Sequence, residues 1–172
     1  MAHILYLLRH GIAEDPRPGM ADEERALTPE GISRTRRAVQ GLAGLGVRPD
    51  VVLSSPLRRT AETAEIAVAV LGVPSVTPYP PLAAGAQPVA ILDGLRPWRR
   101  AAQVLLVGHQ PDLGDLASYL LTGSAGRAHL PFKKAGAAAI SVAELPPRAP
   151  GVLEWFLPPA ALRAIADGQK TR

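Results

Sequence analysis

The chain has 172 residues, enough for one domain that buries about two thirds of the surface of its unfolded chain, and we expect residues 1–172 to form a single domain. It has no cysteine, which excludes disulfides, thiolate metal ligands and a cysteine nucleophile. The net charge of +4 favours anionic partners, but aromatic residues are only 4% of the chain and do not alternate with the basic ones, so nucleic acid is not an expected partner. No apolar stretch approaches the roughly 20 residues that span a bilayer, and no signal-peptide pattern is present, so we expect a cytoplasmic protein without a membrane partner.

The first predicted element is a strand over residues 4–8, an apolar run that reads as buried on both faces. Arg9-His10-Gly11 follow it directly, and a polar loop over residues 12–26 comes next. Ligands of open α/β sheets bind outside the carboxyl ends of the strands. A cation and an imidazole at that edge of the sheet predict a functional site that includes His10.

Two predicted helices flank a second strand at residues 51–53. The first helix begins at Thr28-Pro29, a capping residue followed by a proline suited to the first helical position, and it ends at Gly44 or Gly46. Its expected buried residues are Ile32, Thr35, Val39 and Leu42. The second helix is entered at Ser55-Pro56 and is closed by Gly72. Its expected buried residues are Leu57, Ala61, Ala64, Val68 and Leu71.

The second half of the chain continues this alternation. Residues 73–88 are rich in proline and glycine and predict an irregular crossing loop with a brief strand near Val76. The elements expected after it are a helix over 89–95, a strand over 103–107 that ends in Gly108-His109, a helix over 112–121, and strands at 137–142 and 153–156. Residues 167–172 are expected to be a frayed polar tail. The pattern predicts an α/β fold, a three-layer sandwich with a mostly parallel central sheet and helices on both faces.

Basic side chains follow three of the predicted strands. They are Arg9 and His10, then Arg58 and Arg59, then His109. Because the carboxyl ends of parallel strands meet at one edge of a sheet, these groups are expected to surround one crevice, and planar guanidinium groups match phosphate oxygens well. Backbone N–H groups at the start of the helix after Ser55 can add donors to the same anion. The sequence therefore predicts a phosphate site.

The remaining basic residues have plainer interpretations. His3 and His129 are expected to be ordinary hydrogen-bonded or surface histidines. Lys133 and Lys134 are expected to be loop charges, with a place at the border of the pocket as the less favoured alternative. No Asp or Glu accompanies His10 or His109 at short ligand spacing, so no metal and no cofactor is expected.

Four blocks of sequence carry a resemblance to a known family. They are Arg9-His10-Gly11, residues 26–31 (ALTPEG), residues 54–64 (SSPLRRTAETA) and Val107-Gly108-His109. In this order they resemble the histidine phosphatase superfamily, which has the phosphoglycerate mutase-like fold. The form of residues 108–111 (GHQP), the segment 134–137 (KAGA) and the late Glu154-Trp155 strand are most similar to phosphohistidine phosphatases of the SixA type.

The resemblance implies roles for individual residues. It makes His10 the nucleophile that accepts the phosphoryl group, with Arg9, Arg59 and His109 holding the phosphate oxygens. Arg59 is preferred because it is the fifth residue of the Ser-Pro-Leu-Arg-Arg block, where the family places its arginine. Arg58 is the alternative, and Ser55 is a secondary contact.

One departure from the wider family bears on the substrate. Mutases and ester phosphatases of the superfamily usually carry a carboxylate general acid after a leucine in the crossing loop, where this chain has residues 81–85 (PLAAG) with Ala84 in that place. No acidic residue occurs between Glu65 and Asp93. A positioned acid is worth about 10² to 10⁴ in rate, whereas a phosphoramidate nitrogen protonates readily by itself. The expected substrate is therefore a phosphohistidine on another protein.

Two alternatives remain at this point. One is a small-molecule phosphatase for esters or anhydrides with good leaving groups, and the other is a catalytically silent module that binds phosphate or nucleic acid. Residues 12–26 and 78–88 are the segments able to form a lid over the site. These segments are compact, which favours a phosphate site open to solvent. An open site suits a phosphorylated protein better than a small substrate.

Overall fold

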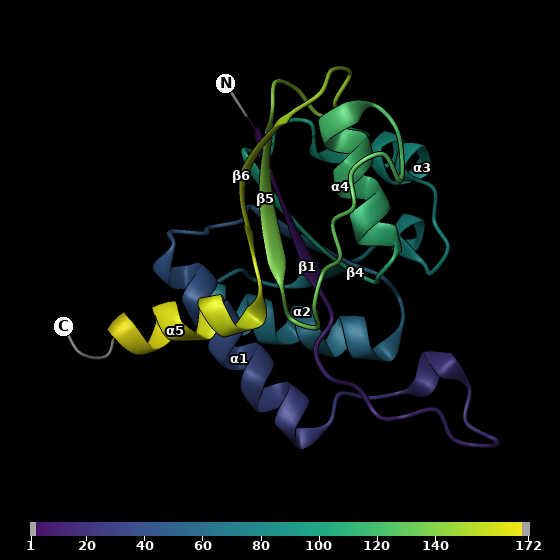
Figure 1. The fold of residues 1–172 in the computed structure, drawn as a ribbon, viewed down its shortest axis with the longest axis vertical. Coiled ribbons are helices and arrows are strands. Elements are labelled where there is room, and N and C mark those ends of the chain that lie inside the picture. The colour runs from purple at the N-terminus through teal and green to yellow at the C-terminus, as the bar shows by residue number, and fades with distance from the viewer. Residues whose placement is uncertain (1–2, 170–172) are drawn as a thin grey trace.

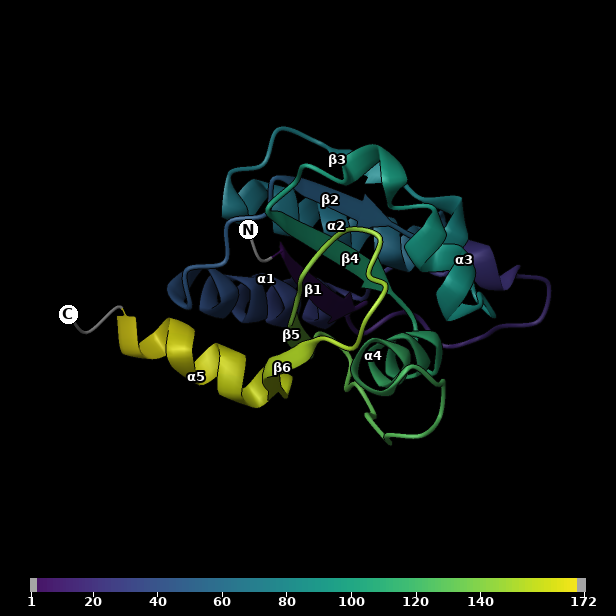
Figure 2. The ribbon, with the colours of Figure 1, turned by 90° about the horizontal axis from the view of Figure 1, so that it is seen from above.

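A six-stranded sheet runs through the centre of the protein in the computed structural model, which describes residues 3–169 (Figures 1 and 2). The order of the strands across the sheet is β3-β2-β4-β1-β5-β6. The first four of these strands are parallel, whereas β5 and β6 run antiparallel to their neighbours. The strands are β1 (His3–Arg9), β2 (Val51–Ser54), β3 (Val76–Pro78), β4 (Gln103–Gly108), β5 (Ala137–Val142) and β6 (Val152–Leu157).

Helices cover both faces of the sheet. One face carries α1 (Pro29–Gly44), α2 (Arg58–Leu71) and α5 (Pro159–Gln169), and the other carries α3 (Pro88–Asp93) and α4 (Asp112–Thr122) (Figure 1). Three short 3₁₀ turns are η1 (Asp22–Glu24), η2 (Pro80–Leu82) and η3 (Arg96–Trp98). The predicted three-layer α/β architecture is confirmed.

The central strand β1 explains why an uninterrupted apolar run is needed here. Leu5 and Leu7 face the core under α3 and α4, whereas Tyr6 and Leu8 face the core under α1, α2 and α5. Successive strand residues point to opposite faces, so a strand covered on both sides has to be apolar at every position. All four side chains are buried.

The register of the parallel strands brings their carboxyl ends together. Arg9 at the end of β1 lies opposite Gly108 of β4, and Ser54 of β2 lies opposite Val107. His10, His109 and Ser55 each follow one of these positions. The expected convergence of the strand ends at one edge of the sheet is therefore present.

The buried faces of the first two helices differ from the predicted ones. Ile32 is 40% exposed, so its predicted place in the core is wrong, and Gly31 and Ala38 complete the buried face of α1 instead. The start of α2 buries Arg59, Thr60 and Thr63, none of which is apolar. Polar burial at this point has a local reason, because these residues face the cluster described below.

The carboxyl-terminal segment is a helix rather than a tail up to the end of the described residues. Residues 167–169 belong to α5, and Asp167 forms an ion pair with Arg37 of α1. Leu162 of α5 is fully buried against α1. Residues 170–172 of the predicted tail lie outside the described residues. No helix between residues 3 and 169 is both long and apolar enough to cross a membrane.

The close packing of α1 on α5 gives a test of the fold. A Cβ atom at Gly41 would lie 2.0 Å from the carbonyl oxygen of Leu162, which is backbone and cannot move aside. We expect Gly41→Ala to lower the free energy of unfolding by about 1–3 kcal/mol, measured by urea denaturation. Gly168→Ala is the matched control because that position is also helical and has open space around it. The control should be neutral or stabilising by up to about 1 kcal/mol. Equal stabilities of Gly41→Ala and the wild type would contradict this packing.

Candidate active site

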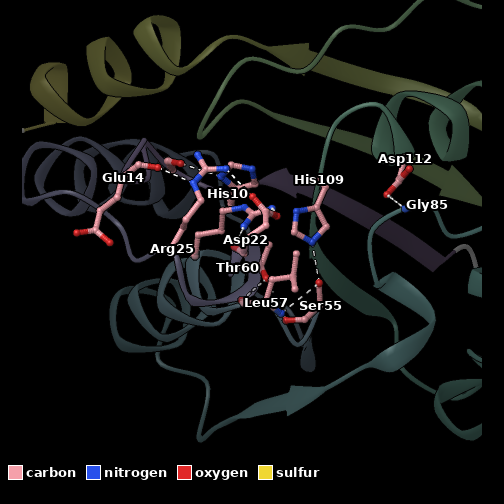
Figure 3. Close-up of polar contacts among 12 residues, drawn as sticks. His10, Glu14, Asp22, Arg25, Ser55, Leu57, Thr60, Gly85, His109 and Asp112 are labelled. Atoms are coloured by element: carbon pink, nitrogen blue, oxygen red, sulfur yellow. Dashed lines mark hydrogen bonds and ion pairs between the residues drawn. The ribbon is translucent and has the colours of Figure 1, made fainter. Parts of the chain in front are cut away.

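His10 and His109 lie side by side at the edge where β1 and β4 end (Figure 3). The centroids of their rings are 5.5 Å apart, and the two residues are 7% and 4% exposed. Arg59 reaches the same place from the first turn of α2, and Arg9 precedes His10 on β1. The structure thus brings together the four residues predicted to form the phosphate site.

A hydrogen bond fixes the tautomer of His10. Its Nδ1 lies 2.8 Å from the carbonyl oxygen of Gly11, and because a carbonyl only accepts, Nδ1 carries the proton. The lone pair of the neutral ring is then on Nε2. The Gly11 N–H in turn donates to the hydroxyl of Thr63, and that hydroxyl donates to the carbonyl of Arg59. The polar residues at the start of α2 therefore hold the backbone that orients His10.

Gly11 is needed at this position because of a close approach. A Cβ atom there would lie 2.1 Å from the hydroxyl oxygen of Thr35 in α1. Any side chain would push the strand end away from α1 and move the carbonyl that binds His10. Within the Arg-His-Gly sequence, Gly11 therefore orients the ring of His10.

Both histidines are held in the neutral state. Burial lowers the pKa of His10 to about 3, and the positive charges of Arg9 and Arg59 and the neighbouring His109 add to this, whereas the hydrogen bond to Gly11 acts against it. Burial also lowers the pKa of His109 to about 4, with a further lowering by Arg59 and an opposing effect of Asp22. At neutral pH the pair presents lone pairs and N–H groups rather than charge.

His109 has one satisfied nitrogen and one free one. Its Nε2 lies 2.7 Å from the hydroxyl oxygen of Ser55, whereas its buried Nδ1 has no hydrogen-bond partner among the described residues. When the Ser55 hydroxyl donates to Nε2, the neutral ring carries its proton on Nδ1. Ser55, predicted as a secondary phosphate contact, is therefore the residue that orients His109.

The two arginines are each anchored on one side. Arg9 donates from Nη1 to the carbonyl of Phe132 at 2.6 Å, and its buried Nε has no partner among residues 3–169. Arg59 donates from Nη1 to the backbone oxygen of Asp22 and from Nη2 to its carboxylate, at 2.7 and 2.8 Å. A buried donor without a partner is costly, so the free Nε of Arg9 indicates a site for an acceptor, and His109 Nδ1 adds a second donor in the tautomer whose Nε2 accepts from Ser55.

Asp22 is the contact that the sequence did not reveal. It lies in η1, within the loop of residues 12–26, and its carboxylate also accepts from Arg25 at 2.8 Å. The hydrogen bonds from Arg25 and Arg59 lower the pKa of Asp22, so the group is a carboxylate. Nothing in its spacing distinguishes it from Glu23 and Glu24, which follow it directly.

Other predicted candidates lie outside this cluster. Arg58 points to solvent and forms an ion pair with Glu62 one turn further along α2. His3 is hydrogen-bonded to the carbonyl of Ala101, and His129 is exposed. Lys133 and Lys134 are exposed on the loop before β5.

The crossing loop around Ala84 does have a carboxylate near it, from a distant part of the chain. Asp112, the first residue of α4, accepts a hydrogen bond from the Gly85 N–H at 2.8 Å. Burial raises its pKa. Figure 3 shows Asp112 beyond His109, on the side away from His10. Through this bond its carboxylate holds the loop against α4.

The described residues also bear on metal binding. Among residues 3–169, no group of three or more His, Cys, Asp or Glu side chains is arranged to hold a metal ion. The cluster is instead built of two neutral imidazoles and two guanidinium groups, which is the chemistry of an anion site.

Comparisons with known proteins agree with this geometry. A family model described as histidine phosphatase superfamily (branch 1) matches residues 5–82. An uncharacterized protein of Picosynechococcus sp. is 43% identical over 138 residues, which are 77% of this chain and 81% of that protein. The structure of the protein histidine phosphatase SixA complexed with tungstate is similar over 92% of this chain and 99% of its own, with 26% identity and a TM-score of 0.79. An alpha-ribazole phosphatase from Shigella flexneri has the same fold over 91% of this chain and 96% of its own, with 20% identity and a TM-score of 0.69.

The chain therefore belongs to the histidine phosphatase superfamily, a superfamily of phosphatases and mutases. Its structural neighbours include SixA phosphatases and phosphatases of small phosphorylated compounds. The resemblance stated from the four sequence blocks is confirmed.

The neutral histidines predict how stability depends on pH. Both pKa values are lowered from the ordinary 6.5, so between about pH 4 and pH 6.5 the unfolded chain binds protons that the folded chain does not. The free energy of unfolding should therefore fall as the pH is lowered through this window. From pH 7.5 to pH 5 we expect a loss of about 2 kcal/mol for each histidine. Urea denaturation at the two pH values should show a smaller loss in His10→Gln and in His109→Gln. An unchanged loss in both variants would contradict the buried neutral state.

Proposed function

We propose that this protein hydrolyses phosphohistidine on another protein, through a covalent phosphohistidine formed on its own His10. One observation carries the proposal. A neutral imidazole with a free Nε2 is buried beside Arg9, Arg59 and His109, and two buried nitrogens of this set, Arg9 Nε and His109 Nδ1, have no partner among the described residues. Such a set is suited to a nucleophile facing a bound phosphoryl group.

The first step follows from the tautomer of His10. The lone pair of Nε2 forms a bond to phosphorus, the phosphorus–nitrogen bond of the substrate breaks, and its electron pair goes to the leaving imidazole. Arg9, Arg59 and His109 bind the equatorial oxygens, whose charge has to be stabilised during transfer. The proton of His10 stays on Nδ1 and is donated in a hydrogen bond to the carbonyl of Gly11, which stabilises the positive charge that the ring acquires.

The second step regenerates the protein. A water molecule attacks phosphorus, the bond to Nε2 breaks, and its electron pair returns to the ring of His10. The water protons remain with the released phosphate and the solvent. The low pKa of His10 favours this second step as well. The site disfavours a charged ring, so release of His10 as a neutral imidazole is favourable.

The leaving group decides between a phosphoramidate and a phosphate ester. The loop position of the general acid is Ala84, and the nearby carboxylate of Asp112 is engaged with Gly85. An alkoxide without a proton donor leaves poorly, whereas a phosphohistidine protonated on its other ring nitrogen leaves as neutral imidazole. The 26% identity to the SixA phosphatase supports the same substrate class.

Asp22 favours this substrate as well. Its side chain is 56% exposed, whereas the Arg59 side chain beneath it is 7% exposed. In the proposed mode of binding, the leaving group extends from the buried phosphate toward solvent on the side of Asp22. A carboxylate at that place attracts a protonated imidazole and repels a leaving group that develops negative charge.

Trapping the intermediate tests the reaction. After incubation with ³²P-labelled phosphoimidazole or a ³²P-phosphohistidine protein, we expect label on the protein that is stable to base and lost in acid. The label should be absent from His10→Ala and retained by His129→Asn, which removes an exposed histidine. A His10→Ala protein that keeps the label would mean a different nucleophile. Faster turnover of sugar phosphates or nucleotides than of phosphohistidine would mean a small-molecule phosphatase.

Replacement of Asp22 tests the choice of leaving group. The quantity to measure is kcat/KM for phosphoimidazole divided by kcat/KM for p-nitrophenyl phosphate, whose leaving group becomes an anion. We expect Asp22→Asn to lower this ratio by about tenfold, the effect of one charge at short range in a partly screened site. Glu23→Gln, in the same turn but without a contact to Arg59, should leave the ratio unchanged. If Asp22→Asn lowers both rates equally, Asp22 only holds Arg59 in place.

A further inference from the structure

A second basic feature lies next to the candidate active site. A groove of about 440 Å³ is lined by side chains from β1, the start of α1, the loop before β5 and the start of α5. Its basic lining residues are Arg9, Arg34, Lys133, Lys134 and Arg163. Arg9 belongs both to this groove and to the phosphate cluster, so the two features adjoin. The proposed chemistry uses only Arg9 of the five.

The lysines of the groove are tied to the strand that carries the nucleophile. Ala135 has a left-handed backbone conformation, with φ of 60°, and its N–H lies 3.1 Å from the carbonyl oxygens of both Arg9 and His10. Ala135 lies within a turn of residues 133–136, in which the Gly136 N–H donates to the carbonyl of Lys133. A non-glycine residue in this conformation is strained. Such strain persists only where the surrounding structure fixes the backbone, and it is concentrated at functional sites. The turn places Lys133 and Lys134 beside the end of β1.

The charges in the groove are largely uncompensated. Of its five basic residues, only Arg34 has an ion pair within residues 3–169, with Glu30 on the exposed side of α1. No acidic residue lines the groove. Thr35 also lines it, and its buried hydroxyl has no hydrogen-bond partner among the described residues. Four basic residues that have no ion pair in the described part of the chain line one groove, in a chain whose net charge is +4, and they create a local field that attracts an anion.

We propose that this groove binds a carboxylate-rich segment of the protein that carries the phosphohistidine. The proposal rests on the proposed function and specifies its substrate. With Arg9 as the common wall, an occupant of the groove lies beside a phosphoryl group on His10, as the residues flanking a phosphohistidine have to. Lysines are flexible point charges and suit scattered carboxylates, whereas a second phosphate is better matched by converging arginine forks. No aromatic side chain lines the groove, so bases of a nucleic acid have nothing to stack on.

Charge reversal at the two lysines tests the proposal. The variant is Lys133→Glu/Lys134→Glu, and the matched control is Arg99→Glu/Arg100→Glu, an exposed basic pair that precedes β4 at the opposite edge of the sheet. The substrates are an acidic phosphotransfer protein phosphorylated on histidine and phosphoimidazole, which has no flanking segment. We expect kcat/KM for the phosphoprotein to fall at least tenfold in the lysine variant, mainly through KM, and to lose most of its salt dependence. The rate with phosphoimidazole should stay within about threefold.

Two outcomes of this comparison would overturn the proposal. If both substrates lose activity equally, the lysines act only on the phosphate site. If the control variant loses as much activity on the phosphoprotein as the lysine variant does, the effect is one of net charge. Absence of turnover with both substrates in the unaltered protein would instead show that the proposed function itself is wrong.

A binding measurement keeps the groove testable without turnover. Titration of the unaltered protein with poly-L-glutamate at low salt should show saturable binding that the lysine variant loses and the Arg99/Arg100 control retains. Tighter binding of an RNA oligonucleotide than of poly-L-glutamate, lost in the same lysine variant, would assign the groove to nucleic acid and contradict the proposal. No difference between the lysine variant and the control would contradict it as well.

Discussion

The parallel pairing of β1 with β4 is the constraint on which the rest of the site depends. The register sets Arg9 opposite Gly108, so the next residue on each strand, His10 and His109, leaves the sheet at the same level. A shift of the register by one residue would turn each strand's side chains toward the opposite face. Close packing opposes such a shift, because both faces of the sheet are buried under helices and displaced side chains would no longer fit. The core therefore determines the spacing of the two imidazoles.

Burial then sets the protonation state of the two imidazoles. A histidine at the surface would titrate near neutral pH, whereas His10, packed between the strand end and α2, stays neutral down to about pH 3. The same burial leaves nitrogens of Arg9 and His109 without partners, at a cost in stability that a bound anion offsets. Asp22 compensates part of the positive charge from the exposed side, through Arg59. In the proposed mechanism, a phosphoryl group supplies the acceptors that this cluster lacks.

The sequence allowed the layout of the fold and the basic residues at the strand ends to be predicted from local patterns, whereas the choice of Arg59 over Arg58 came from the family resemblance. Apolar runs that stop at basic residues marked β1 and β4, and prolines and glycines marked the helix ends. The helix α5 was missed even though Pro159 suits a first helical position and Leu162 and Ala166 are spaced by one turn. Ile32 was placed in the core because it is apolar, but the buried face of α1 is centred on residues that are small enough for close packing, such as Gly31.

Contacts between distant segments were beyond the reach of the sequence. The pairing of Asp22 with Arg59 joins residues 37 positions apart, and Asp112 reaches the crossing loop from the start of α4. Each depends on how a loop folds back over the sheet edge, which no local spacing records. The same holds for Lys133 and Lys134. As loop charges they have no evident role, and their position beside Arg9 emerges only from the turn that Ala135 fixes on the end of β1.

We propose Nε2 of His10 as the nucleophile, with Nδ1 held as a donor by the carbonyl of Gly11. NMR of the phosphorylated protein, labelled with ¹⁵N in its histidines, reports directly which ring nitrogen carries phosphorus. We expect a single phosphorus–nitrogen coupling, to Nε2 of His10, together with a retained proton on Nδ1. Phosphorus on Nδ1, or on either nitrogen of His109, would contradict it.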